Sequence, residues 1–215
     1  MFHRALALFL GLASPAMACD TALILMVDVS NSIDVGEYRL QTDGMADALI
    51  DPEVVEALVQ GQVALSVIQW SGADKQAVSI PWTQIRTRED AVDLSVRARI
   101  MPRAFRLSDT APGEALAFSL SYFNAAPACG RRVIDVSGDG TANAGRDVRQ
   151  VRAAAERQGV TINGIAIEGL GVAITSYYSR AIITRDGFVL TARGHTEYPD
   201  AIRRKILREV SRIMF

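Results

Sequence analysis

The chain alternates short apolar runs with longer segments of helical periodicity, and this alternation constrains its fold more than any other feature. Runs rich in Val and Ile that have the length of β-strands occupy residues 22–27, 63–70, 77–82, 132–136, 161–167 and 187–191. Helical patterns occupy residues 34–50, 51–61, 88–100, 112–125, 146–158, 176–182 and 196–214. Because most of the strands are apolar on both faces, the helices are expected to cover both faces of the sheet.

This order predicts one α/β domain with a doubly wound, mostly parallel, six-stranded sheet. One strand is expected to be antiparallel, because residues 63–70 and 77–82 are separated by only six residues, "SGADKQ", too few for a crossover helix. Pro81 suits an edge strand, since proline cannot donate a hydrogen bond to a second neighbour. Asp34 and Glu37 have the spacing of a capping box at the first helix.

Residues 1–18 are typical of a secretory signal peptide. Arg4 provides a basic start, residues 5–13 are apolar, and Ala16 and Ala18 form an A-x-A cleavage site. The apolar segment is too short to span a bilayer, and no later stretch is long and apolar enough for a transmembrane segment. The sequence therefore predicts an exported protein, periplasmic or extracellular, whose single domain is residues 19–215.

The two cysteines of that domain, Cys19 and Cys129, are predicted to form a disulfide, because exported proteins meet an oxidising compartment. Cys19 lies nine residues before Asp28, and Cys129 lies ten residues before Asp139. If the runs that end at these aspartates are neighbouring parallel strands, the cysteines meet at one end of the sheet and the aspartates at the other. The alternative is two unpaired thiols, with a lipid anchor on Cys19.

The charge of the chain gives no reason to expect nucleic acid or an anionic membrane as a partner. The formal net charge is -1, and 22% of the residues are charged. Basic residues do gather at 203–212, "RRKILREVSR", and this run is predicted to be the solvated face of a terminal helix.

Three segments bring acidic and hydroxyl oxygens to the edge of the sheet where ligands bind in such folds, the carboxyl ends of the strands. Asp28, Ser30 and Ser32 follow the first strand, Thr110 precedes a helix, and Asp139 follows the strand at 132–136. These ligand candidates include no His, Cys or Lys. Ligation by oxygen alone suits a hard cation such as Mg²⁺, with Mn²⁺ or Ca²⁺ as alternatives.

The distribution of charge over these ligands predicts what else the cation would bind. If the three hydroxyls bind directly and the two carboxylates act mainly through waters, the inner shell is almost neutral. The cation then gains most from one more anionic oxygen. An Asp or Glu of a partner protein would supply it, so the site would join two proteins.

These residues resemble the von Willebrand factor A domain. Its metal-ion-dependent adhesion site (MIDAS) combines an Asp-x-Ser-x-Ser motif, a Thr and an Asp-Gly pair, which correspond here to Asp28, Ser30, Ser32, Thr110 and Asp139-Gly140. The match covers nearly all of residues 19–215. Segments such as "CDTALILMVDVSNSID", "RRVIDVSGDG" and "GVTINGIAI" resemble more closely a bacterial exported family of such domains without an established function. The Thr110 segment departs from the common pattern, because "LSDT" has no Gly two residues before the Thr.

Other functions stay open at this point. Asp-x-Ser-x-Ser alone is also typical of a turn followed by a helix N-cap. A Mg²⁺-dependent hydrolase of the phosphatase type would need a second carboxylate where Ser30 stands and a Lys for the phosphate. A structural domain with no partner at the metal site is a further alternative. His195 is expected at the surface, and Trp70 and Trp82 of the predicted hairpin are expected to serve packing rather than ligand recognition.

Overall fold

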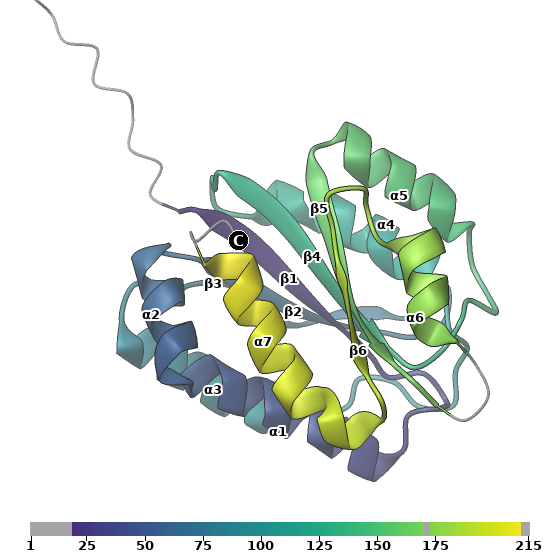
Figure 1. Ribbon diagram of the computed structural model, residues 1–215, viewed down its shortest axis with the longest axis horizontal. Coiled ribbons are helices and arrows are strands. Elements are labelled where there is room, and N and C mark those ends of the chain that lie inside the picture. Colours follow the sequence, from purple (N-terminus) through teal and green to yellow (C-terminus); the bar gives the residue numbers. More distant parts are fainter. Residues whose placement is uncertain (1–18, 170–172, 212–215) are drawn as a thin grey trace, which may run out of the picture.

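The computed structural model describes residues 19–169 and 173–211, so the predicted signal peptide lies outside the described residues. Six strands form one sheet in the order β3-β2-β1-β4-β5-β6 (Figure 1). Their bounds are β1 Thr21–Asp28, β2 Ala64–Trp70, β3 Gln76–Gln84, β4 Arg131–Gly138, β5 Val160–Ile167 and β6 Val189–Ala192. Only the β2–β3 pair is antiparallel. The predicted mostly parallel sheet with one antiparallel edge strand is confirmed.

Helices cover both faces of this sheet, with α1, α2, α3 and α7 on one side and α4, α5 and α6 on the other (Figure 1). Their bounds are α1 Val35–Ile50, α2 Pro52–Gln60, α3 Arg88–Arg99, α4 Pro112–Tyr122, α5 Val148–Arg157, α6 Ile174–Tyr177 and α7 Tyr198–Val210. Asp34 and Glu37 form the predicted capping box of α1. The helix expected at 176–182 begins earlier, and it continues beyond α6 as a π-helical turn, Tyr178–Ile182.

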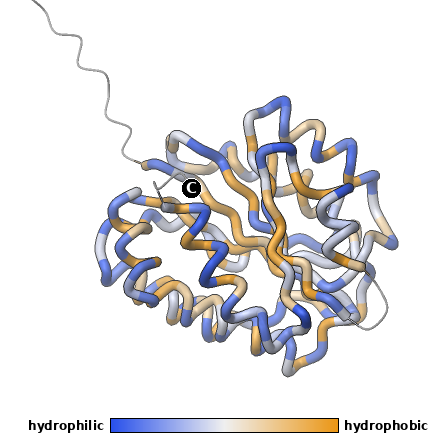
Figure 2. The backbone as a smooth tube through the Cα atoms, in the orientation of Figure 1, coloured by the Kyte–Doolittle hydropathy of each residue, from blue (hydrophilic) through white to orange (hydrophobic). Residues whose placement is uncertain are grey.

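The sheet separates two apolar cores. One lies between the sheet and α1, α2, α3 and α7, and the other lies between the sheet and α4, α5 and α6. β1 is buried along its whole length. Because successive side chains of a strand point to opposite faces of the sheet, those of β1 contribute alternately to the two cores. Figure 2 shows this as hydrophobic strands surrounded by more hydrophilic helices and loops. None of the helices in residues 19–169 and 173–211 has the length and apolarity needed to cross a membrane.

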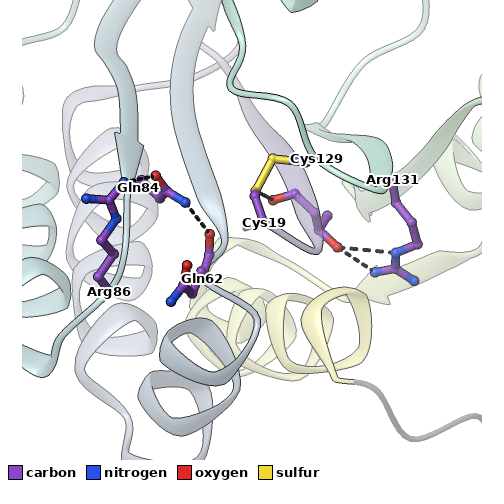
Figure 3. The surroundings of a disulfide bond; sticks show 7 residues. Cys19, Gln62, Gln84, Arg86, Cys129 and Arg131 are labelled. Carbon is purple, nitrogen blue, oxygen red and sulfur yellow. Dashed lines mark hydrogen bonds between the residues drawn. A yellow bond between two sulfur atoms is a disulfide. The ribbon is translucent and has the colours of Figure 1, made fainter. Parts of the chain in front are cut away.

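Cys19 and Cys129 form a disulfide at the end of the sheet where β1 and β4 begin (Figure 3). The two cysteines lie opposite each other because each stands two residues before a paired strand residue, Cys19 before Thr21 and Cys129 before Arg131. The Arg131 guanidinium also donates hydrogen bonds to Thr21 Oγ1, at 3.0 and 3.2 Å. The predicted bridge is therefore present, and a sulfur that takes part in it cannot carry a lipid.

The strand order places a ligand-binding position at the opposite end of the same two strands. The chain runs outward from β1 to β2 and β3, and then returns to β4 on the other side of β1. The carboxyl ends of β1 and β4 are thus the point where the strand order reverses, which is where α/β sheets bind ligands. Asp28 ends β1 at this point, and Gly138 ends β4 beside it.

Candidate metal centre

Asp28 ends β1 and, like Ser30, has no exposed surface. One carboxylate oxygen, Oδ1, accepts a hydrogen bond from the backbone N–H of Ser30 at 2.7 Å. The other, Oδ2, has no hydrogen-bond partner among the described residues. A buried carboxylate oxygen without a hydrogen-bond donor lowers the stability of a folded protein, so Oδ2 is suited to bind a cation or a water.

A row of oxygens leads from the strand end toward the surface. Ser30 Oγ lies 3.3 Å from Ser32 Oγ, and Ser32 Oγ donates to Asp139 Oδ1 at 2.6 Å. Asp139 follows β4, so this contact joins the loops after two neighbouring strands, 107 residues apart in sequence. The structure therefore brings Ser30, Ser32 and Asp139 together next to Asp28, as the sequence predicted.

Thr110 faces this group from the segment before α4. A β-carbon added to Gly140 would lie 3.7 Å from Thr110 Oγ1, which places the Thr110 hydroxyl against the turn that follows Asp139. Asn143 fixes the position of Thr110, because its Oδ1 accepts from the Thr110 N–H at 2.8 Å and its own N–H donates to the Thr110 carbonyl at 3.0 Å. Thr110 thus lies beside the loop that carries Asp139, although its segment "LSDT" is unusual.

The electrostatics of Asp28 are those of a carboxylate that lacks a counter-charge. Burial raises the pKa of Asp28 from 3.8 to about 7, and the hydrogen bonds from Ser30 offset only part of this shift. The nearby Asp139 raises the pKa of Asp28 further, and Arg103 lowers it slightly. A divalent cation would provide the missing positive charge and hold Asp28 ionised at neutral pH.

The donor set fits a hard cation. It consists of the carboxylates of Asp28 and Asp139 and the hydroxyls of Ser30, Ser32 and Thr110, and oxygen ligands of this kind suit Mg²⁺. Among the described residues, no three His, Cys, Asp or Glu side chains form a group that could hold a metal ion. A metal here would therefore depend on the hydroxyls as well as on the two carboxylates.

Two residues for which the sequence predicts no role, Arg103 and Tyr178, also lie at the site. The Arg103 guanidinium donates to the carbonyls of Val29 and Ser30, at 3.0 and 2.9 Å, and so holds the loop after β1 in place. Tyr178 is fully buried, and a β-carbon on Gly138 would lie 2.7 Å from both its hydroxyl and Asp28 Oδ2. No sequence signal marks Arg103, because its partners are backbone atoms 73 and 74 residues away.

Two surface expectations need correction. The His195 side chain is only 10% exposed, and its Nδ1 lies 3.0 Å from Glu37 Oε1, so α1 and the turn before α7 enclose it. Lys205, within the basic run at 203–212, has no exposed surface. It lies on the inner face of α7 because Ala201, Lys205 and Glu209 are spaced by one helical turn. The packing expected of Trp82 is confirmed, since it stacks on Tyr122 with ring centroids 5.6 Å apart.

Comparisons with solved structures show the fold of this chain. The structure of proximal thread matrix protein 1 (PTMP1) from the mussel byssus matches 88% of this chain and 48% of its own, with a TM-score of 0.67 and 21% identity. Another structure of PTMP1 is described as having a zinc-occupied MIDAS motif, with a TM-score of 0.68, 22% identity and the same coverage of the two chains. The chain thus spans about half the length of these structures.

Two bacterial structures show the same fold. A von Willebrand factor type A protein from Catenulispora acidiphila has a TM-score of 0.63 and 15% identity, over 89% of this chain and 43% of its own. The conserved hypothetical protein BatB from Bacteroides thetaiotaomicron has a TM-score of 0.57 and 17% identity, over 88% and 98%. The fold is therefore that of a von Willebrand factor A domain. No curated protein matches the sequence. The model of a family described as "Protein of unknown function (DUF1194)" matches residues 18–214.

Proposed function

We propose that this chain, which belongs to the DUF1194 family of proteins of unknown function, is an exported interaction module that binds a partner protein through a divalent cation. The observation that carries the proposal is the Asp28 carboxylate. It is fully buried, one of its oxygens has no partner among the described residues, and a row of hydroxyl oxygens connects it to the surface. Such a carboxylate would stabilise the fold poorly on its own, but it suits a site for an added cation.

The ligand set that we propose consists of Asp28, Ser30, Ser32, Thr110 and Asp139, with Mg²⁺ as the first candidate metal. The hydroxyls would bind the cation directly, and the two carboxylates would act mainly through bound waters. When bound, the metal supplies a strongly electrophilic centre with little negative charge around it. The chain's own residues orient it, and a partner's Asp or Glu would complete the shell.

Two further observations support the export of the module. Cys19 and Cys129 are joined by a disulfide, and such bonds persist in oxidising compartments such as the periplasm. Residues 1–18 have the pattern of a signal peptide, and the domain begins directly after them. No observation favours the hydrolase alternative, because Ser30 stands where that chemistry would need a second carboxylate.

Metal titration of the chain from residue 19 tests the proposal. Calorimetry on EDTA-treated protein should show Mg²⁺ or Mn²⁺ binding that Asp28→Asn weakens by more than about tenfold, because the variant removes the negative charge beside the cation. Asp186→Asn is the matched control, since Asp186 is exposed on a loop that lines no part of this site. Unchanged binding by Asp28→Asn would contradict the assignment.

A further inference from the structure

Leu107 is an apolar side chain in a place that folding alone does not explain. It is 85% exposed, more than any other large hydrophobic side chain among the described residues. Its backbone φ is +50°, in the left-handed region that leucine rarely adopts. Exposure and backbone strain both oppose a leucine here, and Gly or Asn would fit the same turn with less strain. Strained residues that persist in a fold tend to occur at functional sites.

The position of Leu107 links it to the proposed metal site. An open hollow of about 830 Å³ is bordered by Leu107 and by two of the proposed ligands, Ser32 and Thr110. Its walls come from the loops after β1 and β2 and from the segment before α4. A partner side chain that reached the cation would therefore bring its neighbours into this hollow.

Hydrogen bonds at the two residues after Leu107 hold its loop in place. The Ser108 carbonyl accepts from the Asn31 N–H at 3.0 Å, and the Asp109 carbonyl accepts from Ser71 Oγ at 3.0 Å. The loop is thus tied to the segments that follow β1 and β2. Because its backbone is fixed in this way, the Leu107 side chain is presented at a defined distance from the metal ligands.

The hollow carries charges of both signs. Lys75 lies in its wall, and its ammonium makes no ion pair with any residue in the described part of the chain. Asp74 and Asp109 also line the hollow, so its balance without a metal is slightly negative. A bound divalent cation would be offset by Asp28 and Asp139, so the attraction for a partner carboxylate would come from the cation itself and from Lys75. The surface thus combines a positive centre with one protruding apolar side chain.

We propose that the partner presents an extended peptide segment in which an Asp or Glu is adjacent to an apolar side chain. The carboxylate binds the metal, and the apolar side chain packs on Leu107 across the hollow. This inference rests on the proposed function, because the metal is what places the partner's carboxylate beside the hollow. It adds the residue that selects among acidic segments, since the metal alone would accept any accessible carboxylate.

The strain at Leu107 permits a variant that separates binding from folding. Leu107→Asn removes the apolar contact and keeps a residue that tolerates a positive φ, so the unfolding midpoint should stay the same or rise. Mg²⁺ binding should also stay the same, because Leu107 is not among the ligands. Ile100→Asn is the control, since Ile100 is also strongly exposed, at 71%, but does not border the hollow.

Selection from a library of displayed short random peptides with a fixed central Asp tests the inference. The peptides are bound to the immobilised chain in Mg²⁺ and eluted with EDTA. On the wild type and on Ile100→Asn, we expect peptides with an apolar residue next to the Asp to be enriched. On Leu107→Asn, the dependence on Asp and Mg²⁺ should remain but the apolar preference should disappear. Synthetic copies of the enriched peptides should bind Leu107→Asn roughly tenfold more weakly than the wild type.

Each other outcome has a defined meaning. If Mg²⁺-dependent peptides are enriched without an apolar neighbour, or if the apolar preference persists on Leu107→Asn, the role of Leu107 is wrong and the proposed function stands. If no peptide binds in a Mg²⁺-dependent manner, both the role of Leu107 and the carboxylate-binding function are wrong.

Discussion

Two buried aspartates on neighbouring strands, Asp28 of β1 and Asp135 of β4, show how differently this fold treats the same group. Both side chains are buried, and in both cases burial is the largest cause that raises the pKa of the carboxyl group from 3.8 to about 7. A buried carboxylate needs a cation or several hydrogen bonds to remain charged at low cost. The two sites meet this requirement in different ways.

At Asp135 the chain supplies its own cation. Lys205 of α7 places its Nζ 2.6 Å from Asp135 Oδ1 and 2.5 Å from Glu209 Oε1. Asn163 of β5 donates to the same Glu209 oxygen at 2.8 Å. The three charged side chains and Asn163 form a group between the sheet and α7 with no charged atom directed to solvent. Asp135 Oδ2 and Glu209 Oε2 have no hydrogen-bond partner among the described residues, so the Lys205 ion pairs are what distinguish this group. Such a group fixes the position of a helix on a sheet.

At Asp28 no comparable cation exists among the described residues. Its Oδ2 has no hydrogen-bond partner among residues 19–169 and 173–211, and Arg103, which lowers the pKa of Asp28, directs its guanidinium to backbone carbonyls. The oxygens beside Asp28 lead to the surface rather than into a closed group. The Lys205 ion pair ties Asp135 to the fold, whereas the absence of such a pair at Asp28 supports our proposal that Asp28 binds a cation from outside the chain.

The largest effect is expected at the Asp135 site. Lys205→Met leaves two buried carboxylates without a cation and should lower the free energy of unfolding by about 3–5 kcal/mol, as measured by urea denaturation. The double variant Lys205→Met/Asp135→Asn should recover part of this loss because one of the two charges is then removed. A loss below about 1 kcal/mol for Lys205→Met would show that the group is not closed to water.

The disulfide links the strands of both aspartates at their far ends, so its removal should weaken both regions together. We expect the double variant Cys19→Ser/Cys129→Ser to lower the free energy of unfolding by about 2–4 kcal/mol, because the disulfide joins residues 110 positions apart. Mg²⁺ affinity of the folded variant, measured by calorimetry, should stay within about threefold of the wild type. A larger loss of affinity would mean that the disulfide also shapes the metal site.

The contribution of Asp135 to the pH dependence of the free energy of unfolding can be measured in the metal-free Asp28→Asn variant, where Asp28 no longer titrates. The pKa of Asp135 is about 7 in the folded state and close to its ordinary 3.8 in the unfolded state, so between these values the folded chain binds more protons. Stability should therefore fall as pH rises through this window, by up to about 1.4 kcal/mol per pH unit, and level off above pH 7. Urea denaturation at several pH values measures this slope.

A further Asp135→Asn substitution should flatten that slope. Lys205 and Glu209 face Asp135 from α7, and both remain in this control. The carboxyl groups of Asp51 and Glu168, whose pKa values are lowered by their hydrogen bonds, act with the opposite sign and mainly below this window. Stability that rises with pH between 5 and 7 in both variants would contradict the assignment to Asp135.

The smallest effect on stability is expected from Asp28→Asn itself. In EDTA its free energy of unfolding should lie between that of the wild type and about 2 kcal/mol above it, because the variant removes a buried charge that nothing in the described chain neutralises. Added Mg²⁺ should raise the melting temperature of the wild type only. A clear destabilisation by Asp28→Asn in EDTA would mean that Asp28 supports the fold, as Asp135 does.

Much of this architecture was predictable from the sequence because the signals are local. The apolar runs and the helical periodicity between them predict the sheet and its two helical layers, and the short segment before residue 77 predicts the antiparallel edge. The spacing of Cys19 and Cys129 relative to Asp28 and Asp139 predicts which strands are neighbours. Fixed offsets along parallel strands carry this information without any tertiary data.

The ligand candidates were also accessible, because each follows a strand or precedes a helix in a familiar spacing. What the sequence by itself determined is therefore the fold and the group of oxygens at one edge of the sheet. Only the tertiary structure decided which charges meet and which do not. Lys205 is buried against Asp135, Asp28 has no such partner in the described part of the chain, and Leu107 is held strained beside the proposed metal ligands. These features depend on contacts between distant segments, and no periodicity along the chain encodes such contacts.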